Sequence, residues 1–145
     1  MITIESNALQ VAKNFEKQIA QQPNVVKTAL GRTAEFLIFL IKKRTSQGKD
    51  YQGNNFAKYT SEYANLRKSK GRQVAYADLN FTGQMLSNIT QRSTPTYAII
   101  YFANKYQNVK AIGNQTKRKF FAIGDKEIQP IMNVFMKEYN RLTNQ

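Results

Sequence analysis

Hydrophobic residues recur at helical spacing in three long segments of the chain, two near the N-terminus and one at the C-terminus. The first segment runs from Leu9 to Ala20, and Ser6 or Asn7 is expected to cap it. Pro23 ends this segment, because proline has no backbone N–H to donate. The pattern therefore predicts an amphipathic first helix, and Ile2 to Ile4 before it is expected to form a short strand.

The second helix is expected to start at a cap formed by Asn24 and to close at Gly48. Its residues 36–41 are apolar on all sides, but six residues are far fewer than the roughly 20 needed to cross a bilayer. A buried strand is an alternative, but the helical period continues through the run. We therefore expect a helix buried on two sides, with no membrane contact and with Phe36, Ile38 and Phe39 forming an oligomer interface.

The last helix is expected to be capped by Asp125, with Pro130 tolerated in its opening turns. Its apolar stripe comprises Ile128, Ile131, Met132, Phe135, Met136, Tyr139 and Leu142. We expect this helix and the second helix to supply most of the core.

The middle of the chain mixes short helical and extended patterns. A short helix is expected to begin at Thr60 or Ser61, with Gly71 as a breaker after it. Residues 92–101, rich in Thr, Tyr and Ile, predict a strand. Residues 104–112 predict helical turns that Gly113 ends in a left-handed conformation.

Thr82 and Gly83 open another short helix in this region. The Thr82 hydroxyl is expected to cap it, and Gly83 to allow a close backbone approach at its first turn. Leu86 and Ile89 follow on one face and are expected to be buried. These four residues are thus assigned a structural role.

The combined pattern predicts an α+β fold in a single domain over residues 1–145. We expect two N-terminal helices, a short antiparallel sheet and a C-terminal helix packed on it. A chain of this length can bury about 70% of its unfolded surface, which is enough for one core.

The composition excludes several kinds of chemistry. The chain has no Cys and no His, which removes the usual nucleophile, general base and zinc ligands. Its nine carboxylates are scattered and lack the spacing of a two-metal site, and no glycine-rich phosphate loop is present. We therefore expect no enzyme activity, no metal and no cofactor. The N-terminal residues also lack the pattern of a signal peptide.

The formal net charge is +13, from 22 basic and 9 acidic residues, which indicates an electrostatic partner. DNA phosphates and an acidic protein surface are both candidate partners for this charge. Each group of basic residues taken alone could also be a solvated helix end or loop. The basic residues form three clusters, which are Lys42, Lys43 and Arg44, then Arg67, Lys68, Lys70 and Arg72, and finally Lys117, Arg118 and Lys119.

Several aromatic residues lie close to the third cluster. They could stack on bases as in a single-strand binder, but their strand and helix spacing favours core and interface positions. They are Tyr97, Tyr101, Phe102, Tyr106, Phe120 and Phe121.

The order of motifs over residues 50–129 resembles the virion-morphogenesis or tail-completion proteins of long-tailed bacteriophages. One box of that family is matched by Leu79, Thr82, Gly83, Met85, Leu86, Ser87 and Ile89. An upstream box is matched by Gly53, Phe56, Tyr59, Thr60 and Ser61, and a later segment by Arg118, Phe120 and Phe121. The family's aromatic-His-Gly and Arg-Pro-Phe details are absent.

The resemblance implies a structural virion protein that forms a homo-oligomeric ring at the head–tail junction, after synthesis in the bacterial cytoplasm. Its partners would be other copies of itself, connector and tail-tube proteins, and DNA passing through the channel. The alternative from the residues alone is a small basic nucleic-acid-binding protein.

Overall fold

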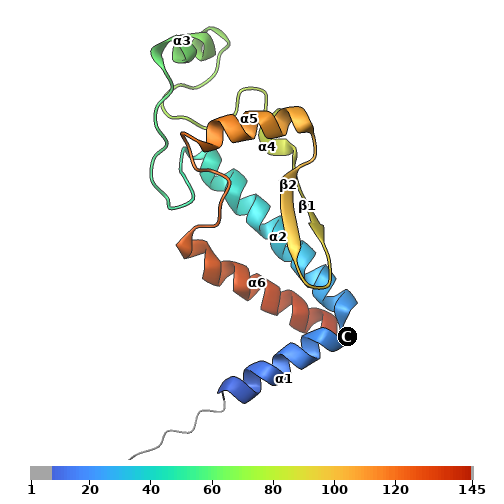
Figure 1. Cartoon of the computed structure of the whole chain (residues 1–145). Helices are drawn as coiled ribbons and strands as arrows, with labels where there is room; N and C mark the ends of the chain where they lie inside the picture. The colour runs from blue at the N-terminus through green and yellow to red at the C-terminus, as the bar shows by residue number, and fades with distance from the viewer. Residues whose placement is uncertain (1–7, 145) are drawn as a thin grey trace, which may run out of the picture.

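The structure is a computed structural model that describes residues 8–144 (Figure 1). Ile2 to Ile4, Ser6 and Asn7, for which a strand and a cap were predicted, lie outside the described residues. The elements are α1 (Ala8–Gln21), α2 (Pro23–Ser46), α3 (Ser61–Ser69), α4 (Gln84–Ser87), β1 (Ile89–Ser93), β2 (Ala98–Phe102), α5 (Lys105–Gln115) and α6 (Asp125–Thr143). The α+β class predicted from the sequence is confirmed, with a two-stranded antiparallel sheet and helices at both ends of the chain.

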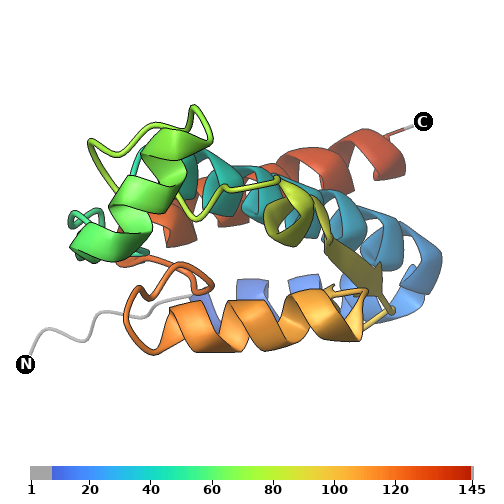
Figure 2. The same cartoon turned by 90° about the horizontal axis from the view of Figure 1, so that it is seen from above.

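Helix α2 is the central element of the fold, since it contacts α1, α6 and both strands. Helix α3 and the residues beside it, 57–72, form an arm at the end of the molecule opposite α1 (Figure 1). Seen from above, α5 runs along one side of the molecule, and α2 and α6 lie on the other side (Figure 2). Figure 1 shows α4 and α5, which contact each other, toward the same end of the molecule as α3.

Pro23 both ends α1 and starts α2. It occupies the first turn of α2, where its missing N–H needs no partner, and Gln22 takes the N-cap position without a side-chain hydrogen bond. The predicted Asn24 cap is therefore wrong by two residues. Further along α2, a Cβ on Gly31 would lie 3.0 Å from Ser93 Oγ, so this glycine allows β1 to approach the helix closely.

The single strand predicted over residues 92–101 is a hairpin. Strands β1 and β2 pair antiparallel, with Thr90 opposite Tyr101 and Arg92 opposite Ile99. The backbone turns between Thr94 and Tyr97, where the Thr94 N–H donates to the Tyr97 carbonyl at 2.8 Å. Ile89 belongs to β1 and not to the preceding helix, because α4 is only one turn long.

Two further helix ends differ from the prediction. Asn104 caps α5 by accepting from the N–H groups of Tyr106 and Gln107, at 2.8 and 3.3 Å, but α5 continues through Gly113 to Gln115. Gly113 is not left-handed. Gly124, and not Asp125, is the N-cap of α6, and its N–H donates to the Glu127 carboxylate at 2.8 Å. Local propensity alone does not decide between adjacent capping positions.

The core divides into two clusters. The larger one joins α2 to the hairpin, α4, α5 and the loops, and its buried members are Leu37, Ile41, Phe56, Ala77, Met85, Leu86, Ile89, Phe102, Ala111 and Phe120. The smaller one joins α1, α2 and α6 around Val26, Ala29 and Tyr139. The apolar stripe of α6 is only partly covered, because Ile128, Met132 and Met136 remain exposed.

Candidate binding surfaces

The apolar run of α2 divides between core and surface. Leu37 and Ile41 are buried, Phe36 and Ile38 are half-buried, and Phe39 is 54% exposed. The Phe36 and Phe39 rings stack with their centroids 6.3 Å apart. A single copy therefore leaves part of this run without a partner.

A groove of about 690 Å³ follows this side of α2, between the helix and the segment around α4. Ile38, Phe39, Lys42 and Lys43 line it, and the Lys43 ammonium lies 5.9 Å from the centre of the Phe39 ring. We call these four residues the α2 surface. It brings two residues of the expected oligomer interface together with two of the first basic cluster.

Arg44, the third residue of the first basic cluster, is buried inside the subunit. Its guanidinium pairs with Glu127 at 2.6 Å and donates to the carbonyls of Phe120, at 2.9 Å, and Ala122. Burial lowers the pKa of Arg44, and the neighbouring Glu127 carboxylate opposes that shift. Arg44 therefore joins the end of α2 to the start of α6 and cannot contact an external partner, which corrects the prediction.

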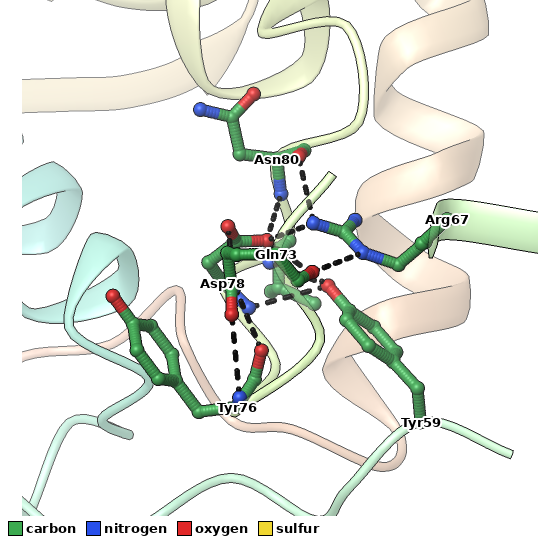
Figure 3. A network of polar contacts seen from close by, with 7 residues as sticks. Tyr59, Arg67, Gln73, Tyr76, Asp78 and Asn80 are labelled. Carbon is green, nitrogen blue, oxygen red and sulfur yellow. Dashed lines mark hydrogen bonds and ion pairs between the residues drawn. The ribbon is translucent and has the colours of Figure 1, made fainter. Parts of the chain in front are cut away.

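Arg67 of the second basic cluster is 1% exposed and is also an internal residue. Its guanidinium pairs with Asp78 at 3.0 Å and donates to the carbonyls of Gln73, at 3.1 Å, and Asn80, at 3.2 Å. Figure 3 shows the guanidinium directed at Asp78 and Asn80, with Tyr59 alongside. Arg67 was predicted to bind an electrostatic partner, but the loop after α3 folds back over it and buries it, which corrects that prediction.

Tyr59 and Asp78 complete this network. The Tyr59 hydroxyl donates to Asp78 Oδ1 at 3.2 Å and accepts from the Leu79 N–H at 3.0 Å. Asp78 Oδ2 accepts from the Gln73 side chain at 2.7 Å. Burial raises the pKa of Tyr59, more strongly than the hydrogen bond from the Leu79 N–H lowers it. The network fixes residues 73–80, which have no regular secondary structure, against the arm.

The remaining basic residues differ in their surroundings. Arg118 is half-buried, and its guanidinium donates to the carbonyls of Ala57, at 2.8 Å, and Lys58, at 3.0 Å. These hydrogen bonds fix the start of the arm to the segment that follows α5. Lys68, Lys70, Arg72, Lys117 and Lys119 are exposed.

The box at Thr82 and Gly83 forms the entry to α4. The Thr82 hydroxyl accepts from the Gln84 N–H at 3.4 Å, a long hydrogen bond, and Gly83 is the N-cap with φ +80°. Among the described residues, its two chain neighbours aside, only Asn80 comes within 4 Å of a Cβ on Gly83, through Oδ1 at 3.7 Å. The predicted close approach is therefore wrong, and the left-handed backbone is what favours glycine. Leu86 and Ile89 are buried, as predicted.

A pocket of about 790 Å³ lies between the arm, the entry to α4, and α5. We call it the arm pocket. Its lining includes Lys58, Tyr59, Tyr63, Phe81, Gln107, Lys110, Lys117 and Arg118. Of these, Lys117 and Arg118 were predicted from the sequence to bind a partner, whereas Lys58, Gln107 and Lys110 were not. No local motif marks those three, because the fold brings them together from separate segments.

Two kinds of site are not found in the part of the chain that the structure describes. No group of three or more Asp, Glu, His or Cys side chains there could hold a metal ion. No helix within residues 8–144 has the length and apolar character needed to cross a membrane. The aromatic residues of the hairpin and of the segments after it divide, since Phe102 and Phe120 are buried whereas Tyr97, Tyr101 and Tyr106 are exposed.

Comparison with known proteins gives no relative, since no protein-family model, curated protein or solved structure matches the chain.

Proposed function

We propose that this chain is a structural protein of a tailed bacteriophage that acts as a ring at the head–tail junction, as a neck or tail-completion protein. The order of motifs over residues 50–129 suggests the family. The observation that carries the proposal is the α2 surface, where Phe39 is 54% exposed beside two lysines. Phe39 stacks on the half-buried Phe36 and lies beside Ile38 in the groove, so the exposed apolar surface is contiguous, and a contiguous apolar patch favours a partner that covers it.

Other exposed apolar residues support assembly. Val109 and Ile112 project from α5, and Ile128 and Met132 from α6. These residues lie on two further helices, so one copy has several surfaces that neighbours in a ring could cover. The role is assembly, with no bond made or broken.

The first experiment asks whether the chain is part of the particle. Purified particles of the phage that encodes the chain should contain it, and antibody labelling should place it between head and tail. A deletion of the gene should leave filled heads and separate tails. Particles that join normally without the chain would refute the proposal.

The second candidate function is nucleic-acid binding, which the exposed Lys68, Lys70 and Arg72 favour. Binding of duplex DNA by the isolated chain would then weaken steeply with salt, because each neutralised phosphate releases counterions. Reversal of Lys42 and Lys43 to Glu separates the two roles at the α2 surface. If the variant no longer docks onto its neighbours in the particle, the partner of these lysines is an acidic protein. If it docks normally but the particles fail to retain DNA, the partner is the DNA in the channel.

A further inference from the structure

The arm pocket has a lining charge of one sign. Four cationic side chains line it, from Lys58, Lys110, Lys117 and Arg118, and no Asp or Glu within residues 8–144 does. Its volume of about 790 Å³ falls in the range of about 300–1,000 Å³ that is usual for ligand sites. The positive potential of the four groups adds in a concave space, which favours an anionic ligand.

An unpaired amide gives a second, independent indication of a ligand. Gln107 lines the pocket, is 8% exposed, and its Oε1 has no hydrogen-bond partner among the described residues. A buried polar atom without a partner costs free energy, which a rotation of the amide toward a hydrogen-bond donor of a ligand in the pocket would recover. Because a primary amide both donates and accepts, Gln107 can bond to both polar groups of a peptide unit.

The aromatic rings of the pocket argue against nucleic-acid bases. The guanidinium groups of Arg67 and Arg118 lie 4.6 and 5.1 Å from the centre of the Tyr59 ring. The Tyr63 ring packs against both Tyr59 and Phe81, with centroids 5.0 and 6.2 Å away. The faces of these rings are thus occupied by one another and by the two guanidinium groups. Proteins that bind single strands instead offer free ring faces on which bases stack.

We infer that the arm pocket binds an acidic peptide segment of a partner protein, with Lys110 and Lys117 contacting its carboxylates and Gln107 its backbone. The identity of that partner as a neighbouring virion protein rests on the proposed function. The ligand chemistry rests on the pocket alone.

The test uses the full chain and a fluorescein-labelled peptide of alternating Asp and Glu. Fluorescence anisotropy at about 0.1 M salt, where the Debye length is about 10 Å, measures its affinity. The pocket variant carries Lys110→Glu and Lys117→Glu. The matched control carries Lys13→Glu and Lys17→Glu, two exposed lysines on α1, at the end of the molecule opposite the arm. Both change the net charge from +13 to +9, because each Lys→Glu change removes two positive charges.

We expect the pocket variant to lose at least about tenfold in affinity and the control to stay within about twofold of the unmodified chain, because short-range pairs outweigh screened distant charge. Gln107→Leu, which keeps every charge and nearly the same volume, should weaken binding several-fold without changing its salt dependence. Circular dichroism of each variant checks that it is folded.

Three results would overturn the inference. Equal losses in the two charge variants would show that only the overall charge matters. No measurable binding of the peptide would show that the pocket has another role. Tighter, pocket-dependent binding of an oligothymidine strand would identify nucleic acid as the ligand. If the chain is present in particles but any of these results is obtained, the inference fails and the proposed function stands.

Discussion

Gly124 is the position at which one added methyl group should damage the fold most clearly. A Cβ there would lie 1.9 Å from the Tyr51 carbonyl oxygen, whereas real Cβ contacts are essentially never shorter than 3.0 Å. The backbone must therefore separate by at least 1.1 Å, since 3.0 minus 1.9 is 1.1. Neither atom belongs to a flexible side chain, so the cost cannot be avoided by a rotamer change.

The required shift would strain the contacts around the start of α6. Gly124 donates to Glu127, and Glu127 pairs with the buried Arg44. Overpacking of this kind costs about 1–3 kcal/mol, and partial loss of the Arg44 contacts adds to it. We expect Gly124→Ala to lower the free energy of unfolding by about 3 kcal/mol and the melting temperature by about 10 °C.

Urea and thermal unfolding followed by circular dichroism measure the effect. Gly113→Ala is the matched control, because Gly113 is exposed within α5 and nothing lies within 4 Å of its Cβ position. That variant should gain about 0.5–1 kcal/mol from helix propensity. If Gly124→Ala were as stable as the unmodified chain to within about 0.5 kcal/mol, the packing of Tyr51 on Gly124 described above would be wrong.

Four further predictions concern the α2 surface, the hydrogen-bond network around Arg67, the Thr82–Gly83 box and the pH dependence of stability. Phe39→Lys should leave a folded monomer and reduce assembly in sedimentation experiments, and undiminished assembly would contradict the α2 interface. Arg67→Met should cost about 3 kcal/mol in urea unfolding, because it leaves a largely buried carboxylate without its cation; a loss below about 1 kcal/mol would contradict that role. Thr82→Ala should cost under about 1 kcal/mol, since the hydroxyl makes one long hydrogen bond, while Leu86→Asp should exceed about 4 kcal/mol; a stable Leu86→Asp protein would contradict its burial. Because the folded pKa of Tyr59 is raised, its contribution to stability is present below the unfolded pKa of about 10 and is lost as pH rises through the folded value. Tyr59→Phe should therefore flatten the fall of stability in alkaline unfolding, and an unchanged slope would contradict this.

The sequence alone was sufficient for features that depend on neighbouring residues. The α+β class, the long helices and the buried Leu86 follow from apolar spacing, and the helix start at Thr60 follows from its capping hydroxyl. Each is determined within a few residues of the chain, where side-chain period and capping chemistry act. The hairpin was missed because residues 92–101 were predicted as one strand, and the turn between Thr94 and Tyr97 contains no glycine.

Only the tertiary structure decided which basic residues are available to a partner. Arg44 and Arg67 read as members of solvated clusters, yet each is buried by a segment distant in sequence, residues 120–127 for Arg44 and residues 73–80 for Arg67. The arm pocket likewise joins Lys58, Gln107 and Lys117 from three separate segments. Burial and charge pairing between such segments depend on the folded path of the chain, which local sequence patterns do not determine.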